Sequence, residues 1–309
     1  MTRGIGIRSG QTVIYEHGQR KRLNEHLRRV YGLLKSVGAD VLQNHLFIDR
    51  IGFREFVNSQ PFRIRIVNKQ NGDQDFFYIK QADASRVYGL ELEYLLSPNR
   101  LHYLTCGDTL IEEHVVGILG DVFIRDWLHS GRLNKIRIAK ETIKFSERCF
   151  VRLLGDMRSY NFVVEMTPDI EEIQVRFRAI DFDQQSYLGR KNFYLNQYFV
   201  ENRELTLFCI KELTQESYHQ YQLEEQAQIY RRMKTALLRL NNFLDVLVGD
   251  TISTPIEVDQ LRGELAEHYE RPLFKKCTTM GGIVRESLEA LRENVERHDF
   301  RDDRSYSLL

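Results

Sequence analysis

One stretch of the chain, residues 161–180, constrains the fold more than any other because it predicts two antiparallel strands joined by a turn. Residues 161–166 form an apolar run, and residues 172–180 alternate apolar with polar side chains. That alternation is the period-2 pattern of a half-buried strand. The Thr-Pro-Asp sequence at 167–169 is typical of a turn. Such a hairpin brings its two open ends side by side, with the chains about 5 Å apart.

Three polar side chains fall at the open end of this hairpin. Asn161 opens the first strand, Asp181 closes the second, and Asp156 lies in the loop just before them. Two carboxylates and an amide at one point are what a magnesium-dependent phosphoryl-transfer site needs. An Asp followed five positions later by an Asn also arises by chance, and an Asp after a strand can be turn chemistry. The rest of the chain therefore decides between these interpretations.

Composition limits the class of protein. The 309 residues suffice for two packed lobes, and the 44 basic and 44 acidic side chains leave no net charge. A dedicated nucleic-acid-binding protein would show a basic surplus, so we expect no nucleic-acid partner. The four cysteines form no CxxC pair and predict free thiols in a reducing compartment, without a zinc site. The N-terminus has no apolar signal segment, and no run approaches a membrane span. We expect a soluble, cytoplasmic protein with no membrane partner.

The first third of the chain predicts a small, strand-rich lobe. The expected elements are a basic amphipathic helix at 19–37 that packs on the body of the protein, strands at 62–68 and 75–80, a helix at about 84–97 and a strand at 109–118. Asn71-Gly72 lies between the two alternating runs at 62–68 and 75–80, and Asn-Gly in that place is the strongest short hairpin signal.

From residue 119 onward, helical patterns dominate. Helices are predicted at 119–129 and 134–153, along a long amphipathic segment at 215–248, from a capping box at Thr254 to Glu257 with proline in the first turn, and at 283–297. The sequence thus predicts an α+β protein with three parts. These are an N-terminal helical extension over residues 1–45, a small antiparallel-sheet N-lobe with one helix over 46–116, and a large, mainly helical C-lobe over 117–309 that contains the hairpin.

Lys80 ends the second strand of the N-terminal hairpin and offers a cation for the phosphates of a nucleotide. An acidic partner on the following helix would hold this side chain extended. Glu91 is preferred because it shares a helical stripe with Val87 and Leu95 and therefore faces inward. Glu93 is the alternative. A lysine at a strand end is by itself most simply a surface residue, and its interest here comes from the order of the other polar groups.

That order, a strand lysine, a helix glutamate, a loop aspartate, an asparagine and a strand-end aspartate, is the template of kinases. Over residues 56–187 the chain resembles the protein-kinase-like superfamily, nearest the aminoglycoside phosphotransferase and choline kinase branch. The Gly-Asp at 155–156, with Asn161 after it, matches the catalytic loop of that branch. The Ile-Asp-Phe-Asp at 180–183 resembles its metal-binding motif, and residues 110–115 resemble the strand and hinge whose backbone binds adenine. The resemblance implies a bilobal protein-kinase-like fold.

The resemblance also implies ATP and Mg²⁺ as cofactors and a role for each matching position. Asp156 would accept the proton of the acceptor hydroxyl, and Arg158 would stabilise charge on the γ-phosphate. Asn161 and Asp181, with Asp183, would hold Mg²⁺. Contacts to the nucleotide, direct or through Lys80, are implied for Lys80, Glu91 or Glu93, Ser59, Glu113 and Val115.

The sequence departs from the branch at three places. Leu154 stands where the branch commonly has histidine, residues 53–62 contain no glycine for a Gly-rich loop, and no Ala-Pro-Glu signature follows Asp183. Backbone amides and Ser59 would cover the phosphates instead. We expect transfer of the γ-phosphate of ATP to a hydroxyl of a small molecule. Two alternatives are a protein side chain as acceptor, which the missing signature disfavours, and a non-catalytic kinase-like binding or scaffold protein.

Overall fold

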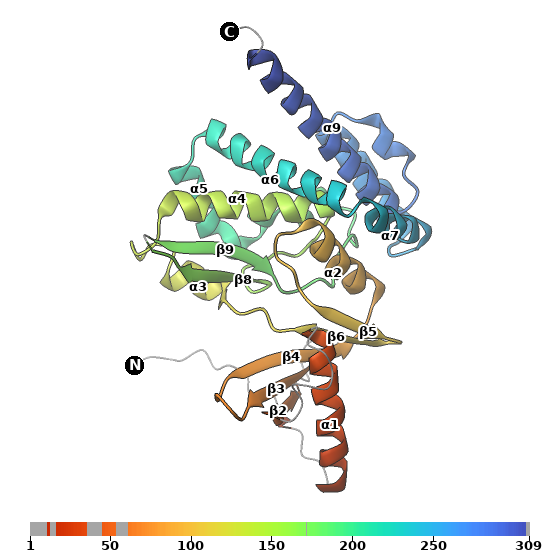
Figure 1. Ribbon diagram of the computed structural model, residues 1–309. Coiled ribbons are helices and arrows are strands. Elements are labelled where there is room, and N and C mark those ends of the chain that lie inside the picture. The colour runs from red at the N-terminus through yellow and green to blue at the C-terminus, as the bar shows by residue number, and fades with distance from the viewer. Residues whose placement is uncertain (1–10, 13–16, 36–44, 54–60, 171, 307–309) are drawn as a thin grey trace. The chain divides into compact units, whose positions relative to one another are not determined.

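The computed structural model describes residues 11–12, 17–35, 45–53, 61–170 and 172–306. The chain divides into two compact units, each of which is continuous in space but not in sequence (Figure 1). The sheet unit comprises Met1–Asp83 and Leu101–His114, and the helical unit comprises Ala84–Arg100 and Val115–Leu309. Each unit has its own apolar core.

Antiparallel strands form the sheet of the sheet unit, in the order β1-β2-β3-β4-β6-β5. They are β1 (Gln11–Thr12), β2 (Leu46–Phe53), β3 (Phe62–Asn68), β4 (Gln74–Gln81), β5 (Tyr103–Cys106) and β6 (Thr109–Glu113). The strands predicted at 62–68 and 75–80 are confirmed as β3 and β4. Gly72, at a φ of +75°, makes the predicted turn between them, a conformation that glycine adopts without steric cost.

Helix α1 (His17–Leu34) covers the sheet with the apolar stripe that its sequence predicts. Leu27 and Leu34 are buried in one cluster with Ile64 of β3 and Phe77 of β4. The prediction of a basic amphipathic helix packed on the body of the protein is therefore confirmed. Most of its basic side chains lie on the exposed face of the helix.

The helical unit holds the remaining elements. Its helices are α2 (Ala84–Leu96), α3 (Gly120–Asp126), α4 (Lys135–Arg152), α5 (Arg203–Glu212), α6 (Gln215–Thr235), α7 (Leu237–Gly249), α8 (Pro255–His268) and α9 (Met280–Tyr306). A small sheet of β7 (Ile118–Leu119), β8 (Phe162–Pro168) and β9 (Ile173–Ala179) packs against α4. The 3₁₀ helices of this unit are η2 (Lys191–Tyr194), η3 (Asn196–Tyr198), η4 (Val200–Asn202) and η5 (Pro272–Lys276). Helix α8 begins as predicted, because the Thr254 side chain accepts a hydrogen bond from the N–H of Glu257.

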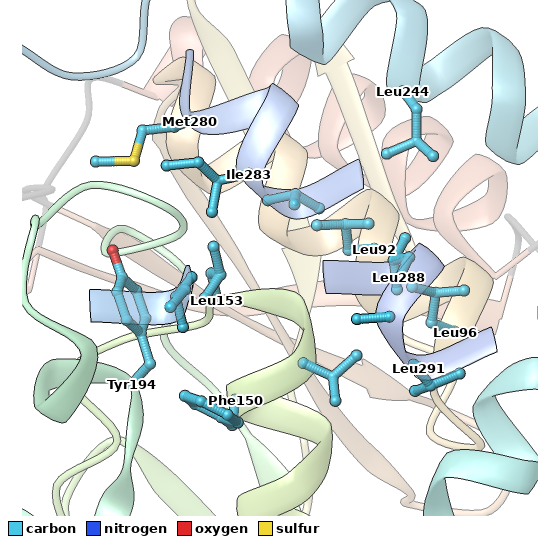
Figure 2. Packing of buried hydrophobic residues seen from close by; sticks show 14 of the residues in the cluster. Leu92, Leu96, Phe150, Leu153, Tyr194, Leu244, Met280, Ile283, Leu288 and Leu291 are labelled. Atoms are coloured by element: carbon cyan, nitrogen blue, oxygen red, sulfur yellow. The ribbon is translucent and has the colours of Figure 1, made fainter. Parts of the chain in front are cut away.

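The core of the helical unit forms where α2, α4, α7 and α9 meet (Figure 2). Leu92 and Leu96 of α2 are fully buried in it, together with Phe150 of α4 and Leu288 of α9. Burial of each such side chain contributes about 1.5–3 kcal/mol. Helix α2 therefore groups with the helical unit, although the sequence analysis counted residues 84–97 with the N-lobe.

These elements confirm the predicted α+β class, with a small antiparallel-sheet unit and a larger, mainly helical one. The strand with Lys80, helix α2, strand β6 and the helices around the hairpin follow one another in the predicted order, whereas β5 was not predicted. Within the described residues, no helix has the length and apolar character needed to cross a membrane.

Candidate functional site

The open ends of strands β8 and β9 lie side by side, as predicted. Phe162, the first residue of β8, pairs with Ala179, the last residue of β9, and the N–H of Ile180 donates to the carbonyl of Asn161 at 3.0 Å. Asn161 therefore lies beside the chain that leads directly into Asp181. Helix α4 lies along the hairpin (Figure 1) and ends at this same edge, so the loop with Asp156 starts here.

The loop brings Asp156, Arg158 and Asn161 into direct contact. Arg158 Nε donates to Oδ1 of Asp156 at 2.8 Å, and Asn161 Nδ2 donates to Oδ2 at 3.2 Å and to the Asp156 carbonyl at 2.8 Å. Both of these bonds use the amide nitrogen of Asn161, so the amide oxygen is the atom of this side chain that could bind a cation. Arg158 is also held by Glu201, at 2.8 Å, and the hydrogen bond to Asp156 raises the pKa of Arg158 further. The guanidinium thus stays charged beside the predicted base.

Gly155 is the tightest position in this loop. A Cβ atom there would lie 2.4 and 2.5 Å from ring carbons of Phe193 and 3.1 Å from the carbonyl oxygen of Gln184. The carbonyl of Phe193 also accepts a hydrogen bond from the N–H of Asp156 at 3.2 Å. Packing therefore requires glycine at position 155, and the segment that touches this glycine also holds the backbone of Asp156. Leu154, in place of histidine, is buried beside it.

We expect Gly155→Ala to lower the free energy of unfolding by about 1–3 kcal/mol, because the added methyl group overpacks the contact with Phe193. Gly263 in α8 is the matched control, since nothing lies within 4 Å of a Cβ built there. Gly263→Ala should raise the same free energy by about 0.5–1 kcal/mol through helix propensity. Urea denaturation of both variants measures this. Wild-type stability in Gly155→Ala would contradict the contact.

Asp181 and Asp183, the predicted metal ligands, face a guanidinium that the sequence analysis did not single out. Arg86 of α2 is buried, and its Nη2 lies 3.9 Å from Oδ1 of Asp181 and 3.5 Å from Oδ2 of Asp183. Both carboxylates remain partly open to solvent, with 34% and 23% of their side chains exposed. No pattern around residue 86 predicts this contact, because it joins segments that are far apart in the chain.

Asn161, Asp181 and Asp183 offer oxygen atoms at this edge of the hairpin, and Mg²⁺ prefers oxygen ligands. Among the described residues, no three His, Cys, Asp or Glu side chains gather closely enough to hold a metal ion. A magnesium site here therefore needs the amide oxygen of Asn161 beside the carboxylates of Asp181 and Asp183. The donor set fits the ion, and Arg86 is a cation of the protein that competes for the same two carboxylates.

Lys80 lies on β4, as predicted, in register with Leu110 of β6. Its ammonium forms a salt bridge with Glu112 of β6, and both side chains are largely buried. No role was predicted for the Glu112 side chain from the sequence. A signal for this pair was present, because Glu112 lies two residues from the strand partner of Lys80, within reach of a long side chain.

The two glutamates considered as partners of Lys80 are both paired inside the helical unit. Glu91 receives two hydrogen bonds from Arg239 of α7, from Nε at 2.6 Å and from Nη2 at 2.9 Å. Glu93 binds Arg152 at the end of α4, and this pair is deeply buried. Lys80 belongs to the sheet unit, so its pairing with Glu91 or Glu93 stays a prediction.

The segment predicted to bind adenine contains the boundary between the units, which falls between His114 and Val115. The Glu113 carboxylate accepts hydrogen bonds from Lys35 Nζ at 3.1 Å and from the backbone N–H of His102 at 2.9 Å. Val115 is buried. The side chain of Glu113 thus has a structural role within the sheet unit. Ser59, predicted to cover the phosphates, lies outside the described residues.

No family model and no curated protein matches the chain. Several solved structures do. The autoinhibited serine kinase domain of titin shows 12% identity over 80% of this chain and 93% of its own, with a TM-score of 0.31. Rad53 in complex with AMP-PNP shows 15% identity over 60% of this chain and 56% of its own, with a TM-score of 0.26. The Neurospora crassa PAN3 pseudokinase shows 8% identity over 95% of this chain and 74% of its own, with a TM-score of 0.22.

Proposed function

We propose that this protein is a cytoplasmic enzyme that transfers the γ-phosphate of ATP to a hydroxyl group of a small molecule. One observation carries the proposal: Asp156 and Asn161 touch at the open end of the hairpin, where the chain continues into Asp181. The motifs at 155–161 and 180–183 favour the aminoglycoside phosphotransferase and choline kinase branch. Four free cysteines are consistent with a reducing compartment.

Residues of the helical unit have separate roles in the proposed reaction. Asp156 orients the acceptor hydroxyl and takes its proton. Arg158, fixed between Asp156 and Glu201, keeps a positive charge next to the base and stabilises the charge that develops on the γ-phosphate. Asn161, Asp181 and Asp183 would hold Mg²⁺, which would supply positive charge for the transferring group. The assignments of Lys80 and of residues 113–115 to the nucleotide stay predictions from the resemblance.

The test is a thermal-shift titration with ATP, with and without Mg²⁺. Binding stabilises the wild type by about 2.7 kcal/mol when ATP reaches a hundredfold excess over its Kd. We expect this gain to require Mg²⁺ and to disappear in Asp181→Ala. Asp169→Asn, at the turn end of the same hairpin, should keep it. The proposal would be contradicted if millimolar ATP gave no magnesium-dependent rise in the melting temperature of the wild-type protein.

Arg86 supports a second candidate, a non-catalytic kinase-like binding protein. Its guanidinium stands beside both carboxylates that would otherwise hold the metal. A protein of this kind would keep its cellular phenotype when Asp156 is replaced, whereas a phosphotransferase would lose it. The two candidates therefore differ in the outcome of one substitution.

A further inference from the structure

A cavity of about 390 Å³ opens into the helical unit, between α4, η3, α5 and the start of α6. Ile143, Cys209, Ile210 and Tyr218 are among the residues that line it, and none of the residues assigned to phosphoryl transfer does. Its volume lies within the range of about 300–1,000 Å³ that is usual for small-molecule sites.

The walls of the cavity carry no charge. Every lining side chain in the described structure is uncharged, and carbon makes up most of the surface. Burial raises the pKa of the Cys209 thiol to about 12, so it stays neutral. The hydroxyls of Thr142 and Thr206 donate to carbonyls of their own segments, at 2.8 and 3.1 Å. An ionic ligand would lose its hydration here without gaining a charged partner, which is costly.

One side of the wall is polar. Ser146 Oγ donates to Oδ1 of Asn196 at 2.8 Å and lies 3.4 Å from Oε1 of Gln197. The bond to Asn196 and the longer contact with Gln197 place two side-chain amides at the cavity wall, where amide N–H and C=O groups can orient one polar group of a ligand. A carbon-rich cavity with a few placed polar groups is the usual composition of a ligand site.

We propose that this cavity binds a neutral, mainly apolar small molecule that carries one hydrogen-bonding group. The site is distinct from the proposed catalytic residues but adjoins the segment that holds them. Asn202, at the end of η4, donates to the carbonyls of Met157 and Asn196 at 2.8 and 2.7 Å. The inference does not depend on the proposed function, because no nucleotide or metal is involved in the binding.

N-phenyl-1-naphthylamine tests the proposal, because it is neutral, has two apolar ring systems and carries one N–H. Its fluorescence rises on transfer from water to an apolar site. We expect saturable binding of one molecule per chain. Anilinonaphthalene sulfonate has the same rings with an added negative charge, and it should bind at least about tenfold more weakly because its charge cannot be solvated in the cavity.

Two variants locate the binding. Ile210→Trp fills the cavity from its rim and Cys209→Phe fills it from within, so each should weaken binding of the neutral dye about tenfold or more. Leu207→Trp is the control, because Leu207 lies on the same helix outside the lining and both Leu207 and Ile210 are more than half exposed. Circular dichroism verifies folding, and Ile210→Trp decides alone if Cys209→Phe does not fold. No saturable binding, equal binding by all variants, or tighter binding of the sulfonate would overturn the proposal.

Discussion

Asp156→Asn is expected to lower the rate of phosphoryl transfer by about 10²–10⁴-fold, the usual contribution of a positioned general base. The variant removes the charge and the proton acceptor, while Asn keeps the shape of the side chain. It also tolerates the left-handed backbone of this residue, at a φ of 56°, better than Ala would. The fold and the contact of Asn161 with the Asp156 carbonyl at 2.8 Å should therefore persist.

Labelled ATP, incubated with the purified enzyme and a cell extract, measures this effect and identifies the class of acceptor. Labelled metabolites support a small-molecule hydroxyl, and labelled protein bands support a protein acceptor. Asp169→Asn removes a carboxylate from the turn of the same hairpin and should retain the wild-type rate. Transfer by Asp156→Asn at that same rate would exclude Asp156 as the base. No transfer by the wild type, together with ATP binding, would favour the non-catalytic candidate.

Sequence patterns predict the elements that bury one regular face. Strands β3 and β9 follow the period-2 rule and β8 is a short apolar run beside a turn signal, so the positions of these strands and the contact between the ends of β8 and β9 were predictable. Strand β2 was not predicted, and its pairing with β3 explains why. The register shifts between Ile48 and Arg50, so the inward alternation of Leu46 and Ile48 changes phase before Ile51. A bulge of this kind removes the periodic signal on which the prediction depends.

Local sequence patterns likewise predict only part of the candidate site. Asp156, Asn161 and Asp181 were predictable because one local hairpin joins them. Arg86 at Asp181 and Phe193 at Gly155 were not, because each contact joins segments that no short pattern connects. Helical periodicity predicts the inward direction of Glu91 of α2 but not that of Glu93, which lies two residues further along the helix. Their arginine partners, on α4 and α7, follow only from the tertiary packing of the helical unit.

Glu93→Gln is expected to lower the free energy of unfolding by about 3–5 kcal/mol. Glu93 and Arg152 form a salt bridge in which 5% and 2% of the side chains are exposed. Removal of one partner leaves the other charge buried without compensation, which is the costly way to break such a pair. Arg152 cannot turn to solvent, because its Nε also donates to the carbonyl of Arg148 at 2.8 Å within the core.

Glu91→Gln is the matched control on the same helix. Its partner Arg239 has 56% of its side chain exposed, so loss of this pair should cost only about 0–1 kcal/mol. Urea denaturation compares the two variants. The double variant Glu93→Leu with Arg152→Met should recover most of the stability lost in Glu93→Gln, since apolar residues of similar size often replace a buried pair without loss. Equal stability of the two single variants would contradict the difference in burial.

The same two variants separate the open alternatives for the partner of Lys80. If Glu91 steadies Lys80 during phosphoryl transfer, Glu91→Gln lowers the transfer rate while the protein remains as stable as the wild type. If Glu93 does so, the loss of rate accompanies the loss of stability and persists at low temperature, where the variant is folded. If Lys80 relies only on Glu112, with which it pairs in the sheet unit, neither substitution on α2 changes the rate of the folded enzyme. Glu112→Gln then lowers the rate instead.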